Sequence, residues 1–548
     1  MLEKQSLPLT TDALLVSLQV DLDTIGLKQL HHLLMERGFV SRLLFLPGVA
    51  GRDKELRDRL TSFVAGLAPG FIGISLMSHE FYAAVGLTAH LKRMFPQIPV
   101  VWGGIHPTIV PEICLEYADY VCVGEGEAAI VQIAGAIRQG QNPGAIANIF
   151  CRRENHIVKN SLAPLIDNLD ALPAGAHLPP HAHVAQGRSI VPLDKDNFKR
   201  YARWRGIVYS VMGSRGCPFS CAYCCNDFFS RLYGTGRIRR RSVPSIISEL
   251  SRQVQAHPEI QYINFQDDCF LACSDEYLAE FCASYGRKVQ RPFIVRCIPS
   301  FINQDRLRQL KAAGLAWISM GLQSGSDRVL RDIYQRRSTS RQFLAAARLI
   351  HHLQIAAYYD VIVDNPLETE ADRRQTIRLL TVVPRPYFLQ LFSLTLYPGT
   401  ALRERILRQY PERTAEYLHK NYHRYQPTFA NRILRMSAYM PPAFTRKLAA
   451  ASVRPDASFR FVLTAAALGS ALIMEPLAYL RVLRRGQQGS LRRTVRQLPA
   501  FFRIGVSRYM KQFPGWFATL AERIVRDDLA VYPGQKKGKA AEKSNRLD

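Results

Sequence analysis

No cysteine follows Cys297 in this chain of 548 residues, which excludes disulfides and thiolate metal sites from its C-terminal part. The first ten residues carry charges of both signs and lack the apolar core of an export signal. Thiols of a protein without an export signal are expected to stay reduced. The 11 cysteines therefore favour metal binding over disulfides, and we expect a cytoplasmic protein.

Acidic residues are also scarce, because 45 Asp and Glu stand against 72 Lys and Arg, a formal net charge of +27. This imbalance favours an anionic partner, and the charge alone leaves nucleic acid, lipid head groups and an acidic substrate open. The deficit is greatest in residues 481–513, which hold nine Lys or Arg and no Asp or Glu. Aromatic residues such as Phe501 and Phe502 are interleaved there, a pattern that suits an anionic membrane surface.

Three closely spaced cysteines stand near the middle of the chain. Cys217, Cys221 and Cys224 form a C-x₃-C-x₂-C spacing, and thiolates this close can converge on one soft metal centre. Three ligands suit a [4Fe–4S] cluster with one iron left open, because a closed structural zinc site usually takes four. The alternatives are a zinc loop or buried cysteines. Cys225 is available as a fourth ligand, but adjacent cysteines tend to point apart, so we expect it not to be required.

Residues 10–150 alternate short apolar runs with segments of helical spacing, which predicts a doubly wound, Rossmann-like parallel sheet. Ligands of such sheets bind outside the carboxyl ends of the strands. Small or polar residues gather at three of these ends. They are Ser75 and Ser78; Gly103, Gly104, His106, Pro107 and Thr108; and Gly124, Glu125, Gly126 and Glu127. We expect these three clusters to form a binding site, because glycines let a flat or bulky ligand approach the backbone closely.

Residues 162–192 are rich in proline and predict an irregular connection to a second domain. Repeated strand and helix patterns over residues 200–400 then predict a partial parallel (β/α) barrel, with functional residues at the carboxyl ends of its strands. Candidate residues at these ends, besides the cysteines, are Tyr223, Gln266, Asp267, Asp268, Arg296, Gln323 and Ser324. No residue is singled out as catalytic.

The cysteine spacing, with Tyr223 just before the third cysteine, resembles the signature of the radical S-adenosylmethionine (SAM) enzymes. Other parts of the expected barrel resemble that family in the same order: Gly321-Leu322-Gln323-Ser324-Gly325, Asp364-Asn365-Pro366-Leu367-Glu368-Thr369 and Tyr397-Pro398-Gly399-Thr400. Gln323 replaces the family's Glu, and Asp364 replaces its Gly.

The resemblance implies that SAM chelates the open iron and is cleaved by one electron to a 5′-deoxyadenosyl radical. It places Gln266, Asp267 and Asp268 at the SAM amino end. It also suggests Arg296 for the SAM carboxylate, with a structural salt bridge as the alternative.

The three strand-end clusters resemble the cobalamin-binding domain that precedes many radical SAM barrels. The Asp-x-His-x-x-Gly sequence that supplies a lower cobalt ligand in other cobalamin proteins is absent from residues 1–150, because His106 has Gly104 two residues before it. Radical SAM relatives commonly lack that sequence, so the resemblance implies cobalamin bound without a protein histidine on cobalt. The alternative is a Rossmann-like domain that has lost its ligand.

Residues 401–548 are helical in pattern and end in a basic stretch that predicts disorder. Phe461 to Leu480 has the length of a membrane span, but Glu475 is costly in a bilayer and Pro476 breaks the helix. A buried hairpin and an interfacial segment stay open. We expect residues 461–513 to dock the protein peripherally on the inner face of the membrane.

Together these patterns predict a cobalamin-dependent radical SAM enzyme, with methyl transfer to an unactivated carbon of a hydrophobic or lipid-like small molecule as the leading reaction. Radical cyclisation or rearrangement, tRNA methylthiolation and a non-catalytic iron–sulfur protein are the alternatives. The expected cofactors are a [4Fe–4S] cluster, SAM and cobalamin. The expected partners are the substrate and an electron donor such as flavodoxin or ferredoxin, while nucleic acid is not expected.

Overall fold

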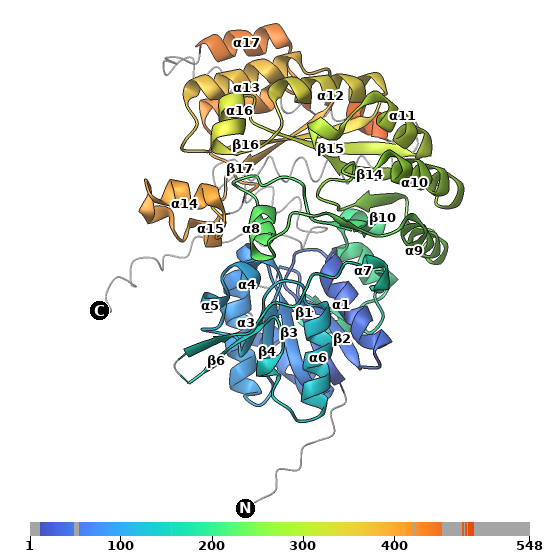
Figure 1. Ribbon diagram of the computed structural model, residues 1–548, viewed down its shortest axis with the longest axis vertical. Helices are drawn as coiled ribbons and strands as arrows, with labels where there is room; N and C mark the ends of the chain where they lie inside the picture. Colours follow the sequence, from blue (N-terminus) through green and yellow to red (C-terminus); the bar gives the residue numbers. More distant parts are fainter. Residues whose placement is uncertain are drawn as a thin grey trace, which may run out of the picture.

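The computed structural model describes residues 11–48, 54–154, 156–420, 422–451 and, except for 476 and 479, residues 474–486. Two sheets organise this part of the chain, one in an N-terminal α/β domain and one in a partial barrel, and the short helix α8 lies between them (Figure 1). In the described residues no helix combines the length and apolar character needed to cross a membrane.

The N-terminal sheet has nine strands in the order β7-β6-β5-β4-β3-β1-β2-β8-β9. Its six central strands, from β5 to β8, are parallel, and antiparallel partners close both edges. The strands are β1 (Thr11–Ser17), β2 (Ser41–Phe45), β3 (Pro69–Ser75), β4 (Val100–Gly103), β5 (Tyr120–Cys122), β6 (Ile149–Arg153), β7 (His156–Lys159), β8 (Ala182–Gln186) and β9 (Ser189–Pro192).

Helices cover both faces of this sheet, as the doubly wound prediction requires. They are α1 (Ile25–Glu36), α2 (Lys54–Leu67), α3 (Phe81–Met94), α4 (Ile105–Ile109), α5 (Pro111–Cys114) and α6 (Glu127–Arg138). One apolar core packs α2 and α3 against the sheet, and a second packs α1 and α6 on the opposite face. Strand residues therefore alternate between two buried sides, since Leu14 joins the first core and Leu15 joins the second.

The irregular connection predicted over residues 162–192 is wrong in part. Strand β8 pairs in parallel with β2, and β9 pairs with β8, so this stretch extends the N-terminal sheet. The pattern was missed because prolines flank these short strands, and because their partner β2 lies far away in the sequence.

The second sheet has six parallel strands in the order β10-β13-β14-β15-β16-β17, which confirms the partial barrel. They are β10 (Val208–Val211), β13 (Tyr262–Phe265), β14 (Phe293–Cys297), β15 (Leu315–Gln323), β16 (Ala356–Val363) and β17 (Phe388–Ser393). A two-stranded ribbon of β11 (Ser214–Arg215) and β12 (Arg239–Arg240) stands beside it.

Helices pack on the outer side of the barrel strands (Figure 1). They are α9 (Val243–Ala256), α10 (Asp275–Lys288), α11 (Gln304–Ala313), α12 (Ser340–His352) and α13 (Glu370–Val382). Helices α7 (Lys195–Tyr201) and α8 (Cys225–Leu232) lie toward the N-terminal domain, and α7 packs into its second core. Ser242 caps α9 as predicted, because its hydroxyl accepts the backbone N–H of Ser245.

The C-terminal region is helical where it is described, with α14 (Ala401–Leu407), α15 (Glu416–His419), α16 (Phe429–Met436) and α17 (Pro442–Ala451). Most of the predicted membrane-docking segment, residues 461–513, lies outside the described residues. One side of its described part packs against the protein: Glu475 is buried and pairs with Arg435, and Val482 and Leu483 are buried at the amino ends of the barrel strands, whereas Leu477 is exposed.

Candidate functional site

The three predicted cluster ligands lie on the loop that follows β10 and β11 at the carboxyl end of the barrel. Backbone bonds hold this loop from two sides, because the Ala222 N–H donates to the Tyr334 carbonyl at 2.9 Å and the Leu402 N–H donates to the Ala222 carbonyl at 2.8 Å. A tight turn brings the Cys224 N–H onto the Cys221 carbonyl at 2.9 Å. The loop is therefore fixed by the barrel before any metal is bound.

The thiols of Cys217, Cys221 and Cys224 are free of disulfides. Among the described residues, no three Cys, His, Asp or Glu side chains converge as ligands of a single metal ion would. The three thiols lie near enough to influence one another's pKa, and in a [4Fe–4S] cluster each thiolate binds a different iron atom. The loop fits the predicted cluster on these grounds.

Arg336 lies beside the cysteine loop and was not found from the sequence. Its guanidinium is 9% exposed and donates to Cys221 Sγ at 3.8 Å and to Tyr223 Oη at 3.2 Å. A third bond, from Arg336 Nη2 to the Gly321 carbonyl at 3.1 Å, connects the cysteine loop to β15. A buried cation at this position compensates the negative charge of thiolate ligands, and N–H···S bonds tune a bound cluster.

Cys225 does not point away from Cys224, in contrast to the expectation for adjacent cysteines. The two thiols interact, and their interaction raises the pKa of Cys224 and lowers that of Cys225. Cys225 is the first residue of α8 and Cys224 is its N-cap. That Cys225 is not required for cluster binding stays a prediction.

The three polar residues after β13 have different environments. Asp267 is fully buried, accepts the Gly213 N–H at 3.0 Å and the Ser214 hydroxyl, and so positions the strand that leads into the cysteine loop. Gln266 faces the inside of the barrel and Asp268 lines a cavity. A contact with SAM stays a prediction for Gln266 and Asp268, whereas both carboxylate oxygens of Asp267 are already used within the protein.

Gln323 and Ser324 also differ in their environments. Gln323 has a φ of +65° at the end of β15, and Ser324 turns into the protein, where its hydroxyl donates to Glu368 Oε1 at 3.0 Å. Burial raises the pKa of Glu368 to about 7. Ser324 is fully buried, so it supports the strand end from behind and does not line the site.

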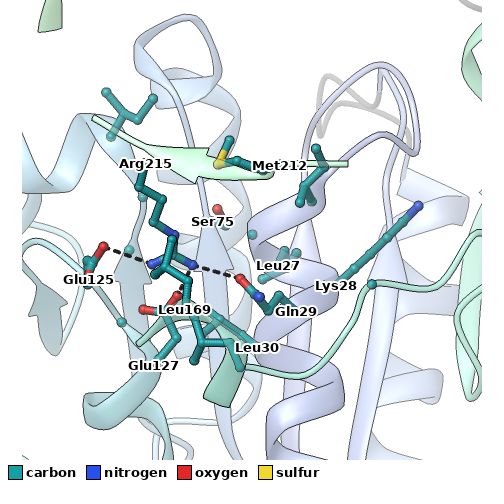
Figure 2. A pocket seen from close by; sticks show the side chains of 18 of the residues that line it. Leu27, Lys28, Gln29, Leu30, Ser75, Glu125, Glu127, Leu169, Met212 and Arg215 are labelled. Atoms are coloured by element: carbon teal, nitrogen blue, oxygen red, sulfur yellow. Dashed lines mark hydrogen bonds and ion pairs between the residues drawn. The ribbon is translucent and has the colours of Figure 1, made fainter. Parts of the chain in front are cut away.

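A cavity of about 470 Å³ lies between the two domains, at the carboxyl ends of both sheets. The N-terminal domain contributes Ser75, Gly103, Gly104 and residues 124–127 to its lining, and the barrel contributes Met212, Cys217 and Asp268. Figure 2 shows side chains of α1, of the 124–127 loop and of the segment before the cysteine loop meeting there. The predicted cobalamin residues and the cysteine loop therefore share one cavity.

Part of the predicted cobalamin cluster lies behind this cavity. His106 is fully buried; its Nδ1 is 3.0 Å from the Ser78 hydroxyl, and its ring packs on Phe81. The Thr108 hydroxyl donates to the Gly104 carbonyl at 2.8 Å and accepts the Gly124 N–H at 3.0 Å. Ser78, His106, Pro107 and Thr108 thus brace the glycine loops and are not among the cavity-lining residues.

The glycines also differ in whether a side chain could be accommodated at their positions. Gly104 has a φ of +101°, and a Cβ there would lie 2.9 Å from the Leu76 carbonyl. A Cβ on Gly124 would overlap the Tyr233 hydroxyl, which accepts the Glu125 N–H at 2.9 Å. A Cβ on Gly103 would meet only the Cys122 Cβ, at 3.7 Å. Gly103 therefore keeps the cavity open, whereas Gly104 and Gly124 are required by the backbone and by the domain contact.

Glu125 and Glu127 form ion pairs across the domain boundary. Arg215, one residue before Gly216 of the cysteine loop, donates to Glu125 at 2.9 Å, to Gln29 at 2.8 Å and to Glu127 at 2.5 Å (Figure 2). Arg239, its partner in the ribbon, donates to both oxygens of Glu125, at 2.7 and 3.0 Å. We call these residues the domain latch; it ties the cysteine loop to the strand ends of the first sheet.

Loss of one latch charge is expected to destabilise the protein in a pH-dependent way. Burial raises the pKa of Glu125, but hydrogen bonds and charges of Arg239 and Arg215 outweigh this effect and lower it overall. A lowered folded pKa stabilises above the unfolded value of about 4.3, and this contribution is lost as the pH falls through the folded value. Glu125→Gln should reduce the free energy of unfolding by about 2 kcal/mol at pH 7, with the difference from wild type shrinking below pH 4.3.

Urea unfolding at a series of pH values measures this effect. Glu112→Gln is the control, since Glu112 pairs with Lys159 at an exposed site within one domain. Equal unfolding free energies for wild type and Glu125→Gln at pH 7 would show that the latch adds nothing to stability.

Comparisons with known proteins agree with this geometry. Residues 211–380 match the radical SAM superfamily, and residues 11–134 match the B12-binding domain. The chain belongs to the radical SAM superfamily and has an N-terminal B12-binding domain. It is a cobalamin-dependent radical SAM enzyme, and its cofactors are accordingly a [4Fe–4S] cluster, SAM and cobalamin.

Individual relatives are distant. An uncharacterized methyltransferase of Pyrococcus horikoshii is 26% identical over 342 residues, 61% of this chain and 69% of the relative. An anaerobic magnesium-protoporphyrin IX monomethyl ester cyclase of Synechocystis is 23% identical, over 65% of this chain and 68% of that enzyme. The structure of the radical SAM methyltransferase TsrM from Kitasatospora setae with cobalamin and [4Fe–4S] cluster aligns with a TM-score of 0.60 at 19% identity, over 73% of this chain and 78% of that one.

The residues present fit these cofactors. Cys217, Cys221 and Cys224 offer three thiolates beside the buried Arg336 cation, and the open face of Gly103 gives a bulky ligand access to the strand ends. The sequence reading missed Arg215, Arg239, Tyr233 and Arg336, whose functions depend on contacts between distant segments. Only the position of Arg215 directly before the cysteine motif was a signal in the sequence.

Proposed function

We propose that this enzyme transfers a methyl group to an unactivated carbon of a small molecule. The observation that carries the proposal is the single cavity lined by both the cysteine loop and the strand ends of the B12-binding domain. When bound, the cluster with SAM supplies hydrogen-atom abstraction, and cobalamin carries the methyl group. The methyltransferase name of the Pyrococcus relative supports this reaction over others of the class.

The residues of the chain hold and orient the cofactors and the substrate, and they exclude water from the site. The cysteine loop presents three thiolates at the mouth of the barrel, and Arg336 holds Cys221 and Tyr223 in place. The domain latch fixes the distance between that loop and the glycines of the first sheet. Such positioning lets two cofactors act on one bound molecule without dissociation of an intermediate.

Radical cyclisation or rearrangement is the second candidate, and the similarity to the Synechocystis cyclase is the observation in its favour.

tRNA methylthiolation has less support from the structure. Cys114, Cys122 and Cys151, the cysteines of the first domain, are buried and separate, and among described residues they form no second metal site.

The predictions of a hydrophobic or lipid-like substrate and of a membrane surface as partner depend on residues 461–513, of which only short stretches are described. The inside of the barrel, which is described, is polar, and it favours a different class of substrate. A one-electron donor such as flavodoxin or ferredoxin stays part of the proposal.

Labelled SAM tests the reaction directly. The reconstituted enzyme, with cobalamin and a reductant, is incubated with trideuteromethyl SAM and a metabolite extract from cells that lack the gene. We expect a product heavier than its precursor by one labelled methyl group, formed by wild type and not by Cys221→Ala. A new product without the label, accompanied by 5′-deoxyadenosine, would instead establish the cyclase or rearrangement alternative.

A further inference from the structure

The inside of the barrel is open, whereas its outer side is closed by helices. Along β14, Phe293 and Val295 are fully buried under the helices, whereas the alternate residues face inward: Ile294 is partly exposed and Arg296 is exposed. Strands β15 and β16 show the same alternation at Ser319 and Asp360. The barrel therefore encloses a solvent-accessible lumen between its strands.

The lumen has an aromatic floor. Trp317, Tyr358 and Phe388 stack on one another with ring centroids 5.0 to 5.8 Å apart and interplanar angles of 16° to 29°. Val482 and Leu483 close this layer from the amino ends of the strands. Trp317 and Phe388 are buried and Tyr358 is half-buried, so a molecule in the lumen meets this apolar layer at the exposed part of the Tyr358 side chain.

A belt of polar side chains lies above this floor and contains two opposite charges. Arg296 and Ser319 are neighbours on β14 and β15, and the Ser319 hydroxyl donates a long hydrogen bond of 3.3 Å to Asp360 on β16. The belt continues to Gln390 of β17, the register partner of Asp360. The charged groups thus stand on either side of a serine, within one layer of the lumen.

Neither charge is fully satisfied within the described part of the chain. Arg296 carries five N–H donors; among the described residues its one hydrogen bond goes to the Gln266 carbonyl at a long 3.4 Å and it has no ion pair, so its other donors are open to the lumen. Burial raises the pKa of Asp360 to about 6, since the distant guanidinium of Arg296 and the Ser319 hydroxyl compensate the loss of water only in part. Asp360, which is desolvated and has few partners, and Arg296, whose side chain is open to the lumen, indicate a ligand that contacts both.

The belt is continuous with the cofactor cavity. Ser210, on the inner side of β10, lines that cavity and donates to Asp23 of the first domain at 2.6 Å. Asn264 of β13 donates to Ser210 at 3.4 Å and connects the cavity wall to the rest of the belt. A molecule held above the floor therefore faces the cavity shared by the two domains.

We propose that the lumen binds a zwitterionic small molecule of the amino-acid class, with its carboxylate on Arg296, its ammonium group on Asp360 and an apolar body on the aromatic floor. This inference names the substrate class of the proposed methyl transfer and rests on that function. It replaces the lipid-like substrate expected from the basic tail. It also assigns Arg296 to the substrate, while Arg336 is the arginine beside the cluster loop.

A series of probes tests the pairing on the holoenzyme. L-phenylalanine carries both charges, 2-phenylethylamine lacks the carboxylate and 3-phenylpropionate lacks the ammonium group. By ligand-observed NMR we expect the wild type to bind phenylalanine roughly tenfold to hundredfold better than either relative, as a charged hydrogen bond contributes. Arg296→Gln should abolish the preference over 2-phenylethylamine only, and Asp360→Asn should abolish the preference over 3-phenylpropionate only.

Equal binding of the three probes to wild type, or an unchanged preference in Arg296→Gln, would overturn the proposal. SAM affinity, measured on the same proteins, should be unchanged in Arg296→Gln; a roughly tenfold loss would return Arg296 to the SAM carboxylate and also overturn it. Arg308→Gln, on the outer face of α11, is the control, and the visible absorbance of the cluster confirms folding.

Failure of this proposal is distinguishable from failure of the proposed function. If the probes are discriminated as expected but labelled SAM gives no methylated product, the substrate class stands and the reaction is another one. If methyl transfer is observed on a molecule without an amino-acid group and the probes are not discriminated, the reaction stands and the substrate class is wrong.

Discussion

Replacing Cys221 with alanine is expected to remove the iron–sulfur cluster and to abolish SAM cleavage. The loop is held in place by backbone bonds and by Arg336, so a missing thiolate cannot be supplied by a small shift of its neighbours. After anaerobic reconstitution, iron and sulfide should fall from about four per chain to near zero. The same result is expected for Cys217→Ala and Cys224→Ala.

Cys225→Ala is the matched control, since Cys225 lies beside Cys224 and touches its thiol. It should retain the cluster and form 5′-deoxyadenosine when reduced in the presence of SAM. A cluster lost in Cys225→Ala and retained in Cys221→Ala would contradict the assignment of the three ligands.

Gly103→Phe is expected to empty the cobalamin site and to leave the cluster intact. The Cβ of residue 103 would meet only one neighbour, at 3.7 Å, so the ring would extend into the cavity of about 470 Å³ between the domains. Cobalamin bound after purification, measured by absorbance, should fall from about one equivalent per chain to below a tenth, as expected when a single crevice is filled. Iron content and the thermal midpoint should stay close to those of wild type.

Gly104→Phe is the comparison for Gly103→Phe, because it is expected to combine the loss of cobalamin with a loss of stability. Its backbone has a φ of +101° and its Cβ would lie 2.9 Å from the Leu76 carbonyl, so this variant should also lose about 1–3 kcal/mol of stability through strain. Cobalamin retained at full occupancy in Gly103→Phe would place the cofactor outside this cavity.

The sequence predicted the helices, the strands and the residues at the strand ends well where the pattern is local. The alternating strand and helix patterns of residues 10–150 and 200–400 correspond to the two largely parallel sheets and the helices that cover them. The cysteine motif and the glycine clusters were placed correctly because parallel strands bring their carboxyl ends to one edge of a sheet. Strands β8 and β9 were missed because they are short and because β8 joins the sheet through β2, which is far away in the sequence.

Side-chain roles were less predictable than positions. Ser324 and Asp267 follow strands as expected, but each bonds to neighbouring protein groups, a choice that depends on the partners Glu368 and Gly213. Glu125 lines the cavity, and its contact with cobalamin stays a prediction; its pairing with Arg215, which is 90 residues away in sequence, was not predicted. No periodicity or motif reports such a contact, because it exists only after the two domains have packed.

The contact between the domains also explains why the latch lies beside the cluster loop. Arg215 is separated from Cys217 only by Gly216, and Tyr233 at the end of α8 accepts the Glu125 N–H. Movement of the first domain relative to the barrel would therefore pull on both sides of the cysteine loop. The latch makes the relative position of the two cofactor sites a property of the folded chain, independent of the substrate.

The central claim is that cobalamin and the cluster share the cavity between the domains. Electron paramagnetic resonance of the holoenzyme tests it, because a reduced cluster nearby speeds the spin relaxation of cob(II)alamin. The account predicts faster cobalamin relaxation in the reduced wild type than in Cys221→Ala, which holds cobalamin without the cluster. Identical relaxation in the two proteins, with cobalamin fully bound in both and the cluster present in the wild type, would contradict it.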